Sequence, residues 1–106
     1  MAARSLDGYR LRPLAEQDLE EIWLYSAGEW GPEQAEAYLE GLFAAFELLS
    51  AMPDIARERL EFVPPVRIHP SAQHLIIYQV TGNHLDVLRI LGGQQNWRAL
   101  LDIIDG

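Results

Sequence analysis

Several residue types that often define a function class are absent from this sequence of 106 residues. It contains no cysteine, which excludes a disulfide scaffold, thiolate zinc sites, iron-sulfur clusters and a cysteine nucleophile. It also contains no lysine: eight arginines face sixteen Asp and Glu residues, and the formal net charge is -8. A general binder of the nucleic-acid backbone needs the opposite balance, so broad nucleic-acid binding is disfavoured.

The chain also lacks long apolar runs. Its first residues contain no apolar segment typical of a secretory leader, and no stretch reaches the ~18 uninterrupted apolar residues of a membrane-spanning helix. We therefore expect a cytoplasmic protein that does not bind membranes. Because 49% of the residues are apolar and 23% are charged, the composition is globular, and the length favours a single domain over residues 1–106.

Two amphipathic helices are expected in the first half of the chain. Between residues 14 and 30, apolar side chains recur on one helical stripe, which we expect to face the core and to include Trp30. Gly31 and Pro32 then indicate a tight link, because glycine accepts unusual backbone angles and proline suits the first position of a helix. A second helix follows and ends before Pro53, so the short link predicts an antiparallel hairpin.

Short alternating segments predict strands before and after this hairpin. They cover residues 9–12, 66–69, 74–80 and 85–91. Gly82 and Asn83 are typical of the tight turn between two antiparallel strands, so the last two segments form a hairpin. Residues 54–65 show no clear period and are interpreted as a loop with one helical turn.

After the last strand, apolar residues recur at helical spacing and predict a short C-terminal helix that includes Trp97 and Leu101. The full order predicts an α+β domain, in which an N-terminal strand precedes a helical hairpin packed on a three- to four-stranded antiparallel sheet. We expect the other face of this sheet to be partly open.

Five short patterns follow one another in a fixed order between residues 9 and 98. They are Ala15-x-x-Asp18-Leu19-x-x-Ile22-x-x-Tyr25, Trp30-Gly31, Gln34-Ala35, His74-x-Ile76-x-Tyr78 and Val87-x-Arg89-Ile90-Leu91. In order and spacing they resemble the RelE/ParE family, the toxic halves of bacterial type II toxin-antitoxin pairs. The link between the helices and the His-x-Ile-x-Tyr strand are more similar to the ParE branch than to the ribonuclease branch.

The resemblance implies a toxin that inhibits DNA gyrase by binding it, without catalysis of its own and without a cofactor or metal. It also implies neutralisation by a ParD-like antitoxin, a ribbon-helix-helix DNA-binding protein whose disordered tail folds onto the toxin in a hetero-oligomer. The candidates for target contact are Arg67, Arg89, Trp97 and Arg98. The candidates for antitoxin contact are Leu24, Tyr25 and Tyr78.

The arginine candidates are chosen because Arg67, Arg89 and Arg98 are the only basic residues after residue 59. The first two lie on strands that we expect to be neighbours, where they would form a basic patch for an anion, an acidic tail or a target. Pairing with local carboxylates is the alternative. Trp97 is either an aromatic anchor beside Arg98 or a cover for the sheet edge.

Leu24 and Tyr25 are chosen because they project away from the centre of the apolar stripe, where an isolated domain gains little from apolar groups. They would contact the antitoxin or a second copy of the chain. Packing around the edge of the hairpin is the alternative.

Two other functions stay open. His69, His74 and His84, together with Tyr78, offer acid-base groups for a ribosome-dependent messenger RNA endonuclease of the RelE type, although that chemistry also needs several cations. The ParE interpretation instead predicts gyrase inhibition that survives His74→Ala. A decayed toxin that only binds its antitoxin is the other alternative, because the segment after Gly92 departs from the family pattern.

The negative charge is concentrated in the helical hairpin. Residues 14–50 contain nine acids and no arginine. This acidic surface is either a solvated face, an electrostatic guide for a cationic partner segment, or a mimic of DNA toward gyrase. The charge thus excludes the hairpin as a nucleic-acid surface and says little about the sheet.

Overall fold

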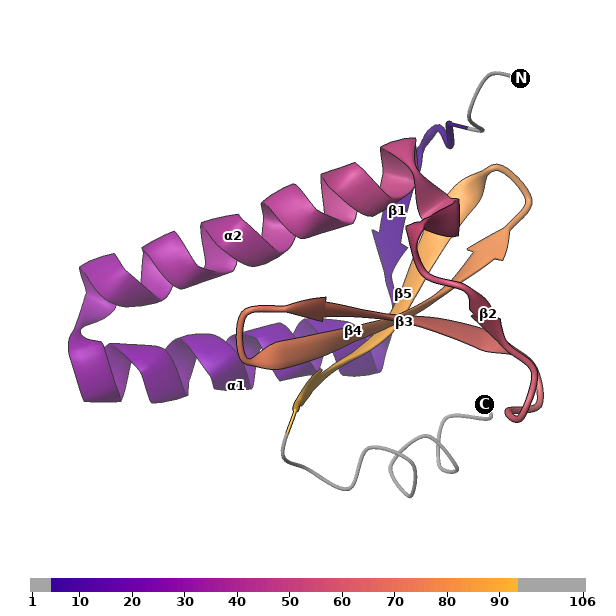
Figure 1. The fold of residues 1–106 in the computed structure, drawn as a ribbon. Helices are drawn as coiled ribbons and strands as arrows, with labels where there is room; N and C mark the ends of the chain where they lie inside the picture. Colours follow the sequence, from indigo (N-terminus) through magenta and orange to yellow (C-terminus); the bar gives the residue numbers. More distant parts are fainter. Residues whose placement is uncertain (1–4, 94–106) are drawn as a thin grey trace.

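The computed structural model describes residues 5–93 of the chain. Its elements are β1 (Gly8–Leu11), α1 (Pro13–Trp30), α2 (Pro32–Ala51), a 3-10 turn η1 (Pro53–Ile55), β2 (Glu58–Arg59), β3 (Val66–Ser71), β4 (His74–Thr81) and β5 (His84–Gly92). The two helices form an antiparallel hairpin that reaches beyond the strands at the end where the helices join (Figure 1).

The link between the helices is as short as the sequence predicts. Gly31 is the only residue between α1 and α2, and its φ of 94° lies in the region that favours glycine. Its N–H donates to the carbonyl of Ala27 at 2.9 Å, and its carbonyl accepts from the N–H of Ala35 at 3.1 Å. One residue therefore ends the first helix and begins the second, with Pro32 at the first helical position.

The sheet differs from the prediction. It is a mixed sheet of five strands in the order β1-β5-β4-β3-β2, whereas the sequence predicted a three- to four-stranded antiparallel sheet. β1 pairs with β5 in parallel. A parallel pair needs a long connection, and here the helical hairpin and the strands β2 to β4 lie between the two strands in the sequence. The second difference is β2, a two-residue strand that pairs with β3 inside the segment interpreted as a loop.

The predicted hairpin between the last two strands is confirmed. Gly82, with φ 61°, is the first residue of the two-residue turn that joins β4 to β5. Along this pair, Ile77 lies opposite Arg89 while Tyr78 lies opposite Val87, so Leu88 is an extra residue in β5. Such a bulge redirects the side chains that follow it.

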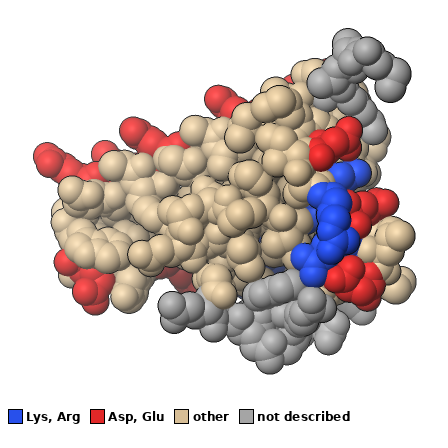
Figure 2. All heavy atoms as spheres, viewed as in Figure 1, with Lys and Arg blue, Asp and Glu red and all other residues tan. Residues whose placement is uncertain are grey.

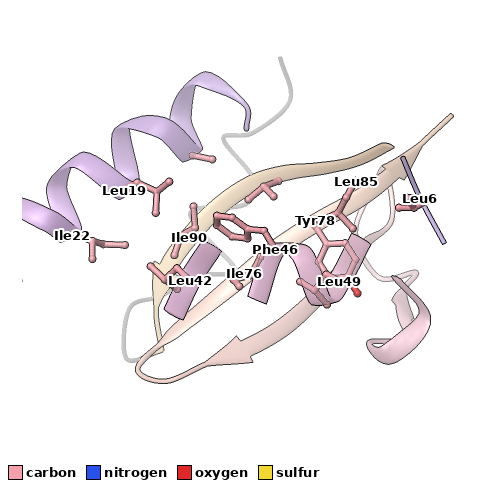
Figure 3. Packing of buried hydrophobic residues seen from close by; sticks show 12 residues of the cluster. Leu6, Leu19, Ile22, Leu42, Phe46, Leu49, Ile76, Tyr78, Leu85 and Ile90 are labelled. Atoms are coloured by element: carbon pink, nitrogen blue, oxygen red, sulfur yellow. The ribbon is translucent and has the colours of Figure 1, made fainter. Parts of the chain in front are cut away.

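The main core lies between the helices and one face of the sheet (Figure 3). The helices contribute a stripe of buried side chains, and alternate side chains of the strands pack against it. The labelled members are Leu6, Leu19, Ile22, Leu42, Phe46, Leu49, Ile76, Tyr78, Leu85 and Ile90. All are buried, so the helical stripe predicted from periodicity packs on the sheet, except for Trp30 at the end of α1.

A second buried cluster consists of Val66, Ile77, Leu88 and Leu91. Because side chains of a strand alternate between the two faces, these residues belong to the face opposite the helices. Partly buried Phe62, Ile68 and Leu75 pack against them. This face is therefore closed where the second cluster lies.

The predicted C-terminal helix lies outside the described residues, as do Trp97 and Arg98. Within residues 5–93, neither helix is both long and apolar enough to cross a membrane.

Candidate functional site

A groove of about 850 Å³ lies between the helical hairpin and the last residues of β5. One wall is α1, whose lining residues recur at helical spacing from Asp18 to Trp30. The other walls come from α2, from the start of β4 and from the end of β5. The groove is thus built by elements that are far apart in the sequence.

Two aromatic rings stand on the α1 wall. The side chains of Tyr25 and Trp30 are 65% and 56% exposed, and the rings meet edge to face with centroids 6.1 Å apart. The prediction that Trp30 packs in the core is wrong, because it is the last residue of α1, in the part of the hairpin that reaches beyond the strands. Leu24 is 59% exposed but does not line the groove, since it lies one residue around the helix from Tyr25.

An ion pair joins α1 to β5 within the groove. The carboxylate of Asp18 accepts from Nε of Arg89 at 2.7 Å and from its Nη2 at 2.8 Å, and it also accepts from the N–H of Ile90 at 2.9 Å. The side chains of Asp18 and Arg89 are only 9% and 15% exposed. The hydrogen bond to Asp18 raises the pKa of Arg89, so this arginine stays charged and held in place.

A second polar contact joins α2 to β4. The hydroxyl oxygen of Tyr38 lies 2.6 Å from Nδ1 of His74 and accepts from the N–H of Gln73 at 3.3 Å. Burial lowers the pKa of His74, although Asp18 acts in the opposite direction. A neutral His74 can accept a hydrogen bond from the hydroxyl of Tyr38 at Nδ1. The two side chains therefore hold the β3-β4 turn against α2.

Arg67 and Tyr78 lie outside this groove. They are opposite each other on β3 and β4, and both hold the η1 segment: Arg67 donates to the carbonyl of Ala56 at 2.5 Å, and Tyr78 donates to that of Pro53 at 2.8 Å. Arg67 also lies 3.4 Å from the carboxylate of Asp54. Tyr78 is fully buried, and burial raises its pKa, so its ring is part of the core in this structure.

Arg67 and Arg89 do not form one patch. Arg67 and Arg89 lie on β3 and β5, and β4 runs between them, so the expectation that their strands are neighbours is wrong. Each arginine faces a carboxylate of a different element. Of the sequence-based candidates within residues 5–93, the groove brings together Tyr25, His74 and Arg89.

Sequence reasoning missed three residues of the groove: Asp18, Tyr38 and Trp30 as a surface residue. Asp18 carried a signal, since a carboxylate directly beside the apolar stripe of a helix needs a partner from another element. Within residues 5–93, no three His, Asp or Glu side chains gather in a way that would hold a metal ion. What the groove offers is an apolar, aromatic wall with fixed polar groups along its floor.

The chain was compared with known proteins. Residues 9–97 match the family described as "ParE toxin of type II toxin-antitoxin system, parDE". The chain is 40% identical over 84 residues to Toxin ParE1 of Mycobacterium tuberculosis, covering 78% of this chain and 86% of that protein. It is 34% identical over 93 residues to Toxin ParE1 of Caulobacter vibrioides, covering 88% of this chain and 96% of that protein.

A solved structure described as "Chromosomal ParDE TA system from P. aeruginosa" contains a chain of similar fold. The TM-score is 0.70 at 22% sequence identity, and the match covers 80% of this chain and 94% of that chain. At this identity the similarity concerns the fold.

Proposed function

The chain belongs to the ParE family of toxins of type II toxin-antitoxin systems, and from this we propose that it inhibits DNA gyrase and is neutralised by a ParD-type antitoxin. The observation that carries the proposal is the match over residues 9–97, together with relatives named as ParE toxins that align over most of both chains. The gyrase target comes from the family resemblance.

For the antitoxin we propose the groove as the binding surface, with Tyr25 and Trp30 as its anchors. Exposed aromatic side chains in a groove are typical of sites where a partner buries them, because their contact area is large and their conformational freedom small. Leu24 extends this surface around α1, whereas Tyr78 is buried outside the groove and is not part of the proposed surface. In this proposal the toxin is a single domain, and its complex with the antitoxin is a hetero-oligomer.

For target contact we propose Trp97 and Arg98. Arg67 and Arg89 were the other candidates, but both are held by carboxylates and carbonyls of their own chain. We therefore assign these two arginines a supporting role: Arg67 fixes the η1 segment, and Arg89 fixes β5 on α1.

Regulated expression of the chain in a bacterial host tests the proposal. We expect growth arrest with a DNA-damage response, and inhibition of supercoiling by purified gyrase when the purified protein is added. Rapid loss of messenger RNA without damage would instead indicate an endonuclease, and unaffected growth would contradict both toxic functions.

The double variant Trp97→Ala/Arg98→Ala tests the target contact. We expect it to abolish growth arrest, whereas Arg57→Ala, an exposed arginine outside the proposed surface, leaves it intact. Arrest that persists in the double variant would contradict the assignment of these two residues.

A further inference from the structure

We propose that the groove binds an amphipathic helical segment of net positive charge, with apolar side chains against Tyr25 and Trp30 and with Arg or Lys toward α1 and α2. This proposal rests on the proposed function, since the tail of the antitoxin is the natural candidate for the segment. It adds the chemistry of that segment.

The charge of the two helices favours a cationic partner. α1 and α2 carry nine acids and no basic residue. In the face shown in Figure 2, acidic side chains lie along both helices toward the end where they join and no arginine is seen there, whereas the visible arginines gather beside β2 at the opposite end, among further acidic side chains. A field of one sign over one half of a molecule accelerates the encounter with a segment of opposite charge.

The charge inside the groove also disfavours an acidic segment. Its one arginine, Arg89, is neutralised by the two-point contact with Asp18 at 2.7 and 2.8 Å. Glu21 also lines the groove and adds a second carboxylate, and burial favours the neutral form of His74. An acidic segment would therefore meet no available cation among the described lining residues and would face repulsion from Glu21.

The length of the groove matches a short helix. Its lining on α1 runs from Asp18 to Trp30, a length of about 18 Å at 1.5 Å per residue. A small metabolite does not span this length, whereas a helix of about twelve residues does. The exposed rings of Tyr25 and Trp30 then take the apolar side chains that such a helix repeats every three to four residues.

The test is a selection from a phage-displayed library of random 20-residue peptides against the intact protein. The variant Tyr25→Ala/Trp30→Ala serves as the bait for counter-selection. We expect peptides that depend on the groove to carry a net positive charge with apolar residues at helical spacing. A groove-dependent pool that is neutral or acidic, or the absence of any groove-dependent peptide, would overturn the proposal.

The best selected peptide is then synthesised and its Kd measured with charge variants. Replacing Glu21, Glu29 and Glu33 by Gln should raise the Kd about fivefold at 50 mM NaCl, since each exposed charge makes only a small contribution to the total. Replacing Glu16, Glu47 and Glu58 by Gln changes the net charge equally but away from the groove, and should raise the Kd much less. Equal effects of both sets would overturn the placement of the cationic segment.

The two proposals fail separately. A chain that arrests growth through gyrase but selects acidic peptides keeps the proposed function and loses the cationic partner. A chain that does not arrest growth but selects cationic, groove-dependent peptides loses the toxic function and keeps the surface.

Discussion

Among the single residues, Asp18 is notable because its carboxylate accepts three hydrogen bonds from β5. It holds Arg89 and the N–H of Ile90, so it fixes the last strand on the first helix. Replacing Asp18 by Asn leaves Arg89 largely buried without its counter-charge, and we expect a loss of about 3 kcal/mol in the free energy of unfolding. Urea unfolding of the purified variant measures this loss.

A double-mutant cycle separates this ion pair from general damage to the core. Arg89→Met removes the charge that Asp18 neutralises, so the double variant Asp18→Asn/Arg89→Met should lose clearly less stability than the sum of the two single variants. Additive losses would mean that the two side chains stabilise the protein independently.

His74 predicts a pH dependence. Burial lowers its pKa from an ordinary value near 6.5, so the unfolded chain takes up a proton at a higher pH than the folded protein. The stability that depends on a neutral His74 is therefore present above pH 6.5 and is lost as the pH falls through the lowered pKa. His69 shifts in the same direction for the same reason.

The measurement is the free energy of unfolding between pH 7.5 and 5.5. His74→Gln should show a smaller decline toward acid pH than the unmodified protein, and the same substitution at His84 corrects for the removal of a histidine elsewhere. Parallel pH profiles for the unmodified protein and His74→Gln would contradict the prediction.

At the scale of elements, the link between the helices depends on one backbone conformation. A Cβ at Gly31 meets no atom within 4 Å, so only its φ of 94° opposes a side chain. With ψ at 161°, this conformation is essentially restricted to glycine, so Gly31→Ala should cost about 1–3 kcal/mol of unfolding free energy. Gly41→Ala is the matched control: it also meets no atom, but it lies inside α2 and should stabilise the protein by about 1 kcal/mol. Thermal unfolding of both variants checks the opposite signs.

The helices could be predicted from the sequence, and the pairing of β1 could not. A helix is encoded locally, by apolar periodicity and by the Gly31-Pro32 link. The alternation of residues 9–12 predicts a strand but does not show which strand it pairs with. In the structure Tyr9 pairs with Leu85, which is far away in the sequence. β2 is too short, at two residues, to show any period.

The groove was foreseen only in part, for a similar reason. Tyr25 was identified because its place on the helix is incompatible with the apolar stripe. Trp30 lies on that stripe, but the stripe continues beyond the strands that it packs against. The apolar period of a helix does not show where the sheet beneath it ends. The side-chain partners of Arg67 and Arg89 come from other elements, so spacing along the sequence did not reveal them.

Across the whole molecule the charge is unevenly distributed: the two helices carry nine acids and no arginine, whereas the strands carry four of the eight arginines. The acids of the helices repel one another in the free protein. This repulsion destabilises the free protein. Salt, a bound cationic segment or the substitution of an acid should each weaken it.

Glu36 gives the sharpest test of this repulsion. It lies three residues after Glu33 and four before Glu40 on the exposed side of α2, so Glu36→Lys converts two repulsive pairs into attractive ones. We expect a gain of about 0.5–1 kcal/mol in unfolding free energy at 20 mM NaCl, which shrinks at 500 mM NaCl because salt screens exposed charges. Glu47→Lys makes the same change of net charge without an acid three or four residues away, and should gain less. Equal gains in both variants would show that net charge, and not the stripe on α2, sets the repulsion.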